Sequence, residues 1–395
     1  MIKRKRVAVL GATGSIGRST LDVLRSGKND FEPVLFSCHR NTAGLLALAK
    51  EYPGAALAVS GADGRGPGFA EFARSKTYFG REGLLCSIAE CGADVVVNGI
   101  AGAAGLEPSL SVLEAGADLA LANKETVVMA GELVFSVARR NKVRIIPVDS
   151  EHSAVFSLME AHGRDRIAEI LLTASGGPFR KKTQEELDRI SPQEALNHPT
   201  WNMGPKITID SATLANKGLE VIEAAELFGL DTGQIKVVVH PQSIVHSMAR
   251  LKDGAVYAQL SRPDIRLPIH NALYYPATTP CSFGFLDFDS LTLEFEKPDH
   301  GRFPMLPLAY ETSARGGMYP AVYNAANEVA VAAFTENRAG FSDIPRIVSS
   351  VLHSGWNFDA PFPGTDSAET LRAILETDRL AREKAENYIL ETIRC

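Results

Sequence analysis

A glycine-rich turn close to the N-terminus constrains the fold of this chain more than any other feature. It reads Gly11-Ala12-Thr13-Gly14-Ser15-Ile16-Gly17, and it follows an apolar strand pattern at Val7–Leu10 and opens a helical pattern. Small residues at this G-x-x-G-x-x-G spacing let backbone N–H groups and a helix N-terminus approach a pyrophosphate. A lone motif of this kind is weak evidence, but its place directly after the first strand predicts a dinucleotide-binding domain.

The first 150 residues alternate short β-rich runs with amphipathic helical stretches. This alternation predicts βαβ units and a parallel sheet with helices on both faces, which is a doubly wound α/β fold. The expected strands are Val7–Leu10, Val34–Ser37, Ala56–Ser60, Asp94–Asn98, Leu119–Ala122 and Arg144–Val148. The clearest helices between them are Leu45–Tyr52, Leu106–Ala115 and Glu125–Arg140.

The middle of the chain predicts a second α/β region. We expect strands at Arg166–Ser175, Ile207–Asp210 and Lys236–His240, a hairpin of Ile244–Leu251 with Ala255–Leu260, and a helix at Thr213–Phe228. The polar stretch Gly176–Lys206 has Gly and Pro at both ends, so it predicts an active-site lid or a poorly ordered loop.

From Met305 onward the pattern is helical, with helices expected at Val322–Thr335, Ile344–Leu352 and Ala368–Ile393. We therefore expect four regions along the chain. They are a Rossmann-like dinucleotide-binding domain at 1–149, a catalytic domain at 150–276 with the lid at 176–206, a linker at 277–304 and a helical domain at 305–395.

The composition excludes several classes of protein. Forty-one basic residues against 47 acidic ones give a net charge of −6, which argues against a nucleic-acid binder that relies on a basic surface. No apolar run is long enough to cross a bilayer, and no signal or transit segment is evident. The five cysteines are scattered without a C-x-x-C pair, so they predict reduced thiols in a cytoplasmic protein rather than disulfides or a zinc site.

The turn after the second strand predicts which dinucleotide binds. An NAD site usually carries an acid there for the ribose 2′-OH. This chain reads Ser37-Cys38-His39-Arg40-Asn41 instead, and Arg40 can neutralise a 2′-phosphate, which favours NADP. Further along, Asn123-Lys124-Glu125 follows the fifth expected strand. Lys124 there could bind a substrate hydroxyl or the cofactor ribose, and capping of a helix by Asn123 is an equally good interpretation.

Three carboxylates stand at positions suited to chemistry. Asp149 and Glu151 flank Ser150 after the strand Arg144–Val148, and Glu220 shares one helical arc with Thr213, Asn216 and Lys217. Without Cys or paired His, such carboxylates suit a hard divalent cation, Mg²⁺ or Mn²⁺ rather than Zn²⁺. Helix capping at residues 149–150 and an i,i+3 pair of Lys217 with Glu220 is the alternative, and the residues alone leave both open.

Two serines favour the metal interpretation because they suggest a neighbouring anion site. Ser175 and Ser211 are each expected just past a strand. Together with Asn216 and Lys217 they could form a phosphate pocket, in which Lys supplies a point charge and the other groups supply directed donors.

These motifs converge on a resemblance. The sequence closely resembles the 1-deoxy-D-xylulose 5-phosphate reductoisomerase family over nearly its whole length. The blocks that carry it are the glycine-rich turn, Ala122-Asn123-Lys124-Glu125, Pro147-Val148-Asp149-Ser150-Glu151-His152-Ser153, His198-Pro199-Thr200-Trp201-Asn202-Met203-Gly204, Asp210-Ser211-Ala212-Thr213-Leu214-Ala215-Asn216-Lys217-Gly218-Leu219-Glu220 and Val239-His240-Pro241-Gln242-Ser243-Ile244-Val245-His246-Ser247. Their joint occurrence is far more specific than the turn alone.

The resemblance implies a V-shaped homodimer of the non-mevalonate isoprenoid pathway. Such an enzyme rearranges the carbon skeleton of a pentulose phosphate and reduces the resulting aldehyde with NADPH, giving 2-C-methyl-D-erythritol 4-phosphate. The divalent cation, Mg²⁺, Mn²⁺ or Co²⁺, would act as a Lewis acid. The lid at 176–206 would carry His198, Trp201 and Met203 and keep the aldehyde from escaping.

The resemblance also assigns roles to residues of this chain. Asp149, Glu151 and Glu220 match metal ligands, and Glu151 and Glu220 also face substrate. Lys124, Ser150 and His198 match positions that hold the substrate backbone, and Ser175, Ser211, Asn216 and Lys217 match its phosphate site. Cofactor contacts match Thr13, Gly14, Ser15, Ile16, Arg40, Asn41, Asn123, Glu125 and Gly204. His39 departs from the family, in which Gly is frequent at this position.

Two other functions remain as alternatives. An NADP-dependent aldehyde or semialdehyde dehydrogenase has a similar glycine-rich turn but needs an activated Cys nucleophile, and no Cys lies in a polar turn after the first domain. A catalytically silent NADP-binding regulator would need no carboxylate triad. His240 and His246 lie in strand-like runs, and we expect them to be core residues without a catalytic role.

Overall fold

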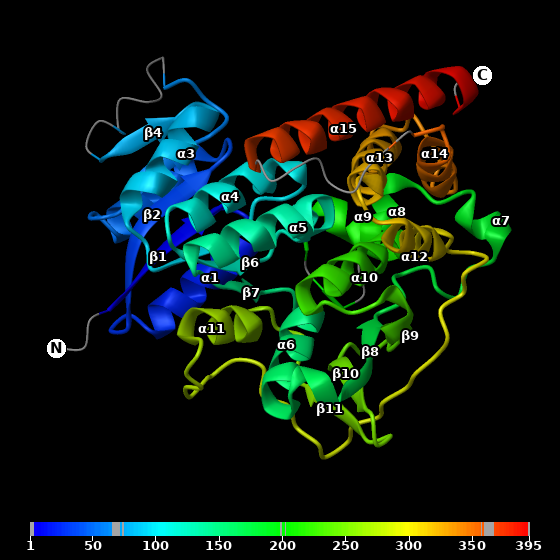
Figure 1. Cartoon of the computed structure of the whole chain (residues 1–395), viewed down its shortest axis with the longest axis horizontal. Coiled ribbons are helices and arrows are strands. Elements are labelled where there is room, and N and C mark those ends of the chain that lie inside the picture. Colours follow the sequence, from blue (N-terminus) through cyan, green and yellow to red (C-terminus); the bar gives the residue numbers. More distant parts are fainter. Residues whose placement is uncertain are drawn as a thin grey trace. The chain divides into compact units, whose positions relative to one another are not determined.

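The computed structural model describes residues 4–64, 72, 75–197, 200–201, 203–356, 358 and 367–393. The chain forms two compact units, each discontinuous in sequence (Figure 1). Unit 1 comprises Met1–Thr126, Val134–Ser153 and Asp264–Gly284. Unit 2 comprises Val127–Leu133, Ala154–Pro263 and Phe285–Cys395.

Unit 1 contains a seven-stranded sheet in the order β4-β3-β2-β1-β5-β6-β7, and all of its paired strands are parallel. The strands are β1 Lys5–Leu10, β2 Phe31–Cys38, β3 Ala56–Val59, β4 Thr77–Phe79, β5 Val95–Asn98, β6 Asp118–Leu121 and β7 Ile145–Pro147. All six expected strands are confirmed, and only the short edge strand β4 lacked a sequence signal. Valine and leucine fill β1, β5 and β6 because strands covered on both faces exclude water from both sides.

Helices cover both faces of this sheet, which confirms the doubly wound fold. They are α1 Ser15–Ser26, α2 Thr42–Glu51, α3 Gly80–Cys91, α4 Leu106–Glu114, α5 Lys124–Asn141 and α11 Arg266–Tyr274, with a 3₁₀ turn at Ala103–Gly105. The strand order reverses at β1, so right-handed crossovers place α1 and α2 on one face and α3 to α5 on the other. Helix α11 packs against α1, and the Nζ of Lys5 on β1 donates to the carbonyl of Leu273 at 2.7 Å.

Unit 2 is built on a four-stranded mixed sheet in the order β11-β10-β8-β9. The strands are β8 Ile167–Ala174, β9 Ile235–Val239, β10 Val245–Leu251 and β11 Val256–Leu260. The hairpin of β10 and β11 is confirmed, since these strands pair antiparallel across a turn with Gly254 at φ 91°.

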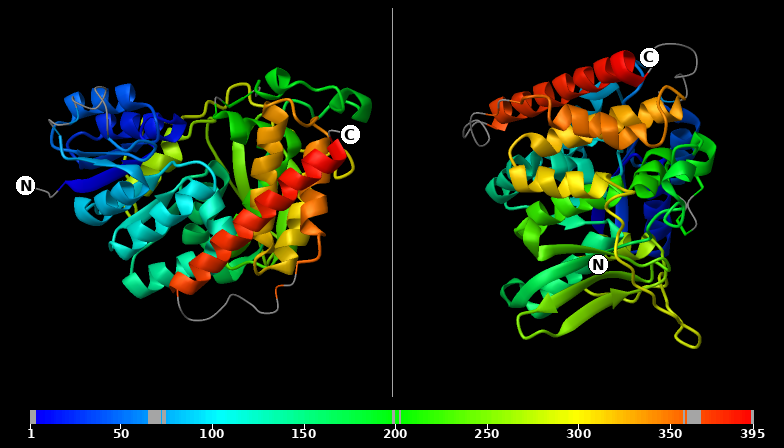
Figure 2. Two further views of the ribbon diagram at one scale, coloured as in Figure 1. Left: turned by 90° about the horizontal axis from the view of Figure 1, so that it is seen from above. Right: turned by 90° about the vertical axis from the view of Figure 1, so that its right-hand side faces the viewer.

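Helices make up the rest of unit 2. They are α6 Ser150–His162, α7 Gln184–Leu187, α8 Pro192–Ala195, α9 Pro205–Thr213, α10 Ala215–Phe228, α12 Met305–Arg315, α13 Tyr319–Thr335, α14 Asp343–Leu352 and α15 Ser367–Tyr388, with short turns at Arg164–Arg166, Thr232–Gln234 and Ile389–Ile393. Helix α13 is buried almost all round, because α9, α12, α14 and α15 all contact it. Figure 2 shows the long α15 crossing over α13 and α14, which confirms the expected helical C-terminal region.

Two sequence predictions around residue 210 are wrong. Ile207–Asp210 is not a strand but part of α9. The β-branched run of Ile207 to Ile209 suggested a strand, yet Pro205 after an extended Gly204 is a strong helix start and outweighs it. The expected helix 213–228 begins only at Ala215, because Leu214 adopts a left-handed φ of 61° and separates α9 from α10.

The segment 176–206 is more ordered than its composition indicates. Thr183 and Ser191 form capping boxes that start α7 and α8, and Phe179, Leu187 and Ile190 are buried in the core of unit 2. The prediction of a poorly ordered loop is therefore wrong for residues 179–196, and the lid stays a prediction. Of the four residues 198, 200, 201 and 203 in the predicted lid, Thr200, Trp201 and Met203 are described, whereas His198 lies outside the described residues.

Candidate active site

The glycine-rich turn of unit 1 provides an open helix N-terminus. Gly11 has φ 73°, and a Cβ on it would lie 2.9 Å from the carbonyl oxygen of Gly99. A Cβ on Gly17 would lie 2.4 Å from the backbone of Ala12, so only glycine allows α1 to start here. Gly14 is the N-cap and provides no side-chain cap, and the first turn of α1 has no acid. The free N–H groups and the helix dipole are thus left for an anionic ligand.

The turn also depends on a residue that the sequence analysis did not single out. The Oγ of Ser37, at the end of β2, accepts a hydrogen bond from the N–H of Gly11 at 3.0 Å. Ser37 is 2% exposed. A buried serine in an otherwise apolar strand was the signal that could have indicated this contact, which fixes the turn to the neighbouring strand.

The end of β2 holds the residues predicted to select the cofactor. Arg40 is exposed, and Asn41 caps α2 by accepting from the N–H of Gly44 at 3.0 Å. His39 is also exposed, and its Nδ1 lies 3.1 Å from the Oγ of Ser60. Burial raises the pKa of the neighbouring Cys38 thiol to about 11, so this thiol is protonated at neutral pH and is no nucleophile.

Asn123, Lys124 and Glu125 lie where β6 leads into α5. Asn123 caps α5, since its Oδ1 accepts from the N–H of Thr126 at 3.0 Å and its Nδ2 donates to Glu125 at 3.0 Å. The capping interpretation is thus confirmed. Lys124 is free of that role, and its Nζ donates to Asp149 at 2.8 Å with both side chains largely buried.

Asp149 and Glu151 stand where β7 leads into α6. The Oδ1 of Asp149 accepts from the N–H of Glu151 at 3.2 Å, and the Oγ of Ser150 donates to the carboxylate of Glu151. Both carboxylates are half-buried. The expected capping contact of Asp149 is therefore present, and because a carboxylate oxygen can accept more than one partner, this contact does not exclude a ligand role.

The corresponding carboxylate of unit 2 is Glu220, which is fully buried on α10. It accepts from the Nδ2 of Asn216 at 2.6 Å and from the ammonium of Lys217. The shared helical arc of residues 216, 217 and 220 is confirmed, whereas Thr213 belongs to α9. The i,i+3 pair of Lys217 with Glu220 is also present.

Four further predicted site residues belong to unit 2. Ser175 directly follows β8 as expected, and its Oγ accepts from the N–H of Gly177 at 3.2 Å. Ser211 lies inside α9 rather than past a strand, for the reason given above, and is half-buried. Gly204 is the N-cap of α9. His198 lies outside the described residues, so its predicted role has no structural test.

The two histidines expected to be core residues are fully or largely buried. The Nδ1 of His240 lies 2.8 Å from the carbonyl of Glu294, and its ring stacks on Phe295. The Nε2 of His246 lies 2.9 Å from the Oγ of Ser261, and the ring of Trp201 lies 6.3 Å from it. These contacts agree with structural roles.

The parallel sheet with its strand order and the glycine-rich turn at the start of α1 define unit 1 as a domain of the Rossmann class. Three family models match most of the chain. A model of 1-deoxy-D-xylulose 5-phosphate reductoisomerase matches residues 7–131, its C-terminal domain matches 145–228, and a further DXP reductoisomerase C-terminal domain matches 260–384. The chain belongs to the 1-deoxy-D-xylulose 5-phosphate reductoisomerase family.

Individual relatives are similar in sequence to this chain over nearly its full length. The chain is 45% identical over 388 residues to 1-deoxy-D-xylulose 5-phosphate reductoisomerase of Chlorobium chlorochromatii, covering 98% of this chain and 100% of the relative. The relative from Treponema denticola is 46% identical, covering 89% and 91%.

Solved structures are also similar. The Zymomonas mobilis reductoisomerase in complex with NADPH is 38% identical, with a TM-score of 0.89 and coverage of 99% and 100%. A DOX-P reductoisomerase with NADPH, fosmidomycin and magnesium is 37% identical, with a TM-score of 0.92 and coverage of 98% of both chains.

Proposed function

We propose that this protein catalyses the NADPH-dependent rearrangement and reduction of 1-deoxy-D-xylulose 5-phosphate to 2-C-methyl-D-erythritol 4-phosphate. The observation that carries this proposal is full-length membership of the family, combined with a donor set in each unit that suits the reaction. An enzyme of this kind serves isoprenoid biosynthesis by the non-mevalonate route. The cytoplasm is the expected compartment, and no helix in the described part of the chain is long and apolar enough to cross a membrane.

The cofactor is NADPH, and most of its proposed contacts lie in unit 1. Its pyrophosphate would lie at the N-terminus of α1, against the backbone of Thr13 to Ile16, because that end has neither a side-chain cap nor an acid. Arg40 would neutralise the 2′-phosphate, and Asn41, Asn123, Glu125 and Gly204 are the further proposed contacts. Two of the similar solved structures are complexes with NADPH.

A divalent cation would be held by Asp149, Glu151 and Glu220. Each of these residues has a carboxylate, and the proposed set contains no imidazole or thiolate. This donor set fits Mg²⁺ or Mn²⁺, with Co²⁺ as a further candidate, rather than Zn²⁺. When bound, the ion supplies Lewis-acid polarisation of the substrate oxygens, and NADPH supplies the hydride.

The side chains of the protein would bind and orient the sugar phosphate. Lys124 pairs with Asp149, and Lys217 pairs with Glu220, so each ammonium group lies beside a proposed metal ligand. The phosphate would be bound by the residues proposed from the resemblance, which are Ser175, Ser211, Asn216 and Lys217. Lys124, Ser150 and His198 would orient the carbon chain, and the stretch with Trp201 would exclude water from the aldehyde.

A homodimer is proposed as the assembly. In unit 2, β11 is an edge strand, and an exposed strand edge can pair with a second copy. Val256 and Tyr257 on this strand are 46% and 43% exposed, and Phe285 and Phe288 of the following linker are 72% and 67% exposed. Mass measurement by light scattering on wild type and Tyr257→Asp tests this surface, and an unchanged mass in the variant would contradict it.

One experiment tests the reaction. Purified protein is mixed with NADPH and 1-deoxy-D-xylulose 5-phosphate, and the loss of absorbance at the NADPH band is followed with and without a chelator. We expect turnover that stops with chelator and returns with Mg²⁺ or Mn²⁺. No loss of NADPH, with formation of NADPH from NADP⁺ and an aldehyde instead, would favour an aldehyde dehydrogenase, and tight NADPH binding without any turnover would favour a silent regulator.

A further inference from the structure

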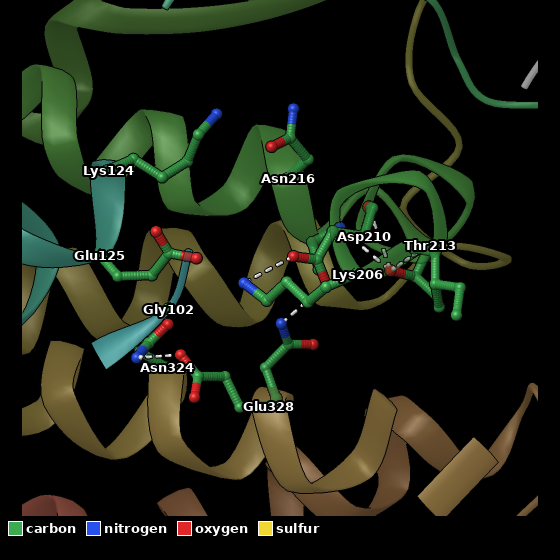
Figure 3. A network of polar contacts seen from close by, with 12 residues as sticks. Gly102, Lys124, Glu125, Lys206, Asp210, Thr213, Asn216, Asn324 and Glu328 are labelled. Atoms are coloured by element: carbon green, nitrogen blue, oxygen red, sulfur yellow. Dashed lines mark hydrogen bonds and ion pairs between the residues drawn. The ribbon is translucent and has the colours of Figure 1, made fainter. Parts of the chain in front are cut away.

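A buried carboxylate stands directly before one of the proposed phosphate ligands. Asp210 on α9 is 1% exposed, and Ser211 follows it. Its Oδ2 pairs with the ammonium of Lys206 at 2.8 Å, one turn earlier on the same helix (Figure 3). Burying a charged side chain costs free energy of folding unless its partners are well placed. The partners of Asp210 therefore indicate why a carboxylate is kept at this position.

The second partner of Asp210 comes from a distant part of unit 2. The Nδ2 of Asn327 on α13 donates to the Oδ1 of Asp210 at 2.9 Å. Asn327 is fully buried in a helix rich in alanine and valine, and its own Oδ1 has no hydrogen-bond partner among the described residues. A buried amide with an orphaned oxygen costs stability. Its position is therefore better explained by the hydrogen bond that it donates than by packing.

The consequence for α9 is a fixed rotation about its axis. Asp210 and Ala212 are buried, whereas Ser211 between them is half-buried. Because successive residues of a helix point about 100° apart, holding Asp210 inward sets the direction of Ser211. Leu214 alone separates α9 from α10, and the Oγ of Thr213 accepts from the N–H of Ala215 at 3.3 Å. A rotation of α9 would thus also displace Asn216 and Lys217.

We infer that Asp210, held by Asn327 and Lys206, is a positioning residue for the phosphate-binding residues Ser211, Asn216 and Lys217. The inference rests on the proposed function, because it takes these three residues as the phosphate site. Asp210 is not proposed to touch the substrate. It acts by orienting the two helices that carry the ligands, and Asn327 links that orientation to the helical core.

The test compares two buried asparagines of one helix. Asn327→Leu removes the contact with Asp210. Asn324→Leu is the matched control, since Asn324 is equally buried on α13 but donates to Glu328 at 3.1 Å instead (Figure 3). For both variants we would measure the melting temperature, the KM for the pentulose phosphate, the NADPH dissociation constant and the dissociation constant of inorganic phosphate by calorimetry.

We expect Asn327→Leu to weaken phosphate binding and raise the substrate KM about tenfold, with NADPH affinity unchanged. Asn324→Leu should lower the melting temperature by a similar amount and leave both phosphate readouts within twofold. If Asn327→Leu does not fold, Asp210→Asn serves instead, because it keeps the acceptor for Asn327 but loses the charge that holds Lys206. Equal phosphate affinity in wild type and the folded variant would overturn the inference. A wild-type protein that binds phosphate but turns over no substrate would overturn the proposed function alone.

Discussion

The glycine-rich turn of unit 1 and the helix pair α9–α10 of unit 2 present ligands in opposite ways. The turn offers backbone N–H groups, and its glycines are required because any added Cβ at Gly11 or Gly17 would collide with backbone. The helix pair offers buried charged side chains, each with a partner such as Lys217 for Glu220. The first region is therefore sensitive to added atoms, and the second to removed charges.

The largest effect is expected where a charge is removed. Glu220→Gln and Asp149→Asn should each lower turnover about a thousandfold or more, because an amide cannot supply the negative charge of a metal ligand. NADPH binding should persist, since neither residue is a proposed cofactor contact. Steady-state rates at limiting Mg²⁺ and cofactor titration measure both.

Glu223→Gln is the control for a changed carboxylate on the same helix, because Glu223 is equally buried on α10 but is not a proposed ligand. Near wild-type activity in Glu220→Gln would remove that residue from the ligand set. An equal loss in Glu223→Gln would mean that burial, rather than metal binding, explains the effect.

In the glycine-rich turn, by contrast, an added side-chain atom should disturb the structure. Gly17→Ala places a Cβ 2.4 Å from the backbone of Ala12, so α1 must shift. We expect a loss of about 1–3 kcal/mol in the free energy of unfolding and a loss of NADPH binding. Gly54→Ala is the control, because nothing lies within 4 Å of its added Cβ. Denaturant titration with cofactor binding measures both, and a stable Gly17→Ala that binds NADPH would contradict the close-approach argument.

The same contrast explains what could be predicted from the sequence. The strands of unit 1 and its turn follow from local patterns, because strand, turn and helix are consecutive. In unit 2 the local signal failed at Ile207–Asp210, where β-branched residues form a helix that Pro205 starts and Lys206 stabilises. Asn327 could not be linked to Asp210 at all, since 117 residues separate them and only the packing of α13 on α9 brings them together.

Selection of the cofactor should depend on one exposed side chain. Arg40→Ala should weaken NADPH by about one to two decades and NADH far less, because a charge-assisted contact contributes about 1.5–3 kcal/mol and only NADPH carries the 2′-phosphate. Lys50→Ala, an exposed cation on α2, is the control for net charge. Fluorescence titration with both cofactors checks this, and equal losses for the two would assign Arg40 another role.

The stretch after α8 is proposed to close over substrate. Trp201→Ala should reduce kcat/KM for substrate about tenfold, because a closed lid excludes water and positions the reacting groups. It should spare the melting temperature, since Trp201 is not part of the core of unit 2. In a Trp356→Phe background the emission of Trp201 should shift when substrate analogue, metal and NADPH bind. Trp201 emission that does not change on ligand binding, together with protease resistance of the free enzyme, would argue against closure.

The smallest effect concerns acid stability of unit 1. Burial lowers the pKa of His270 on α11, whose Nε2 lies 3.0 Å from the Oγ of Thr279. The folded state therefore keeps this imidazole neutral at pH values where the unfolded chain already binds a proton. Stability is complete above the ordinary histidine pKa of about 6.5 and falls as the pH drops below it. Wild type should thus lose about 2 °C more than His270→Gln in melting temperature between pH 7.5 and pH 5.5. His300→Gln, on the exposed linker, should behave as wild type. If the melting temperature of His270→Gln falls as much as that of wild type between pH 7.5 and pH 5.5, the acid sensitivity originates in groups other than His270 on α11.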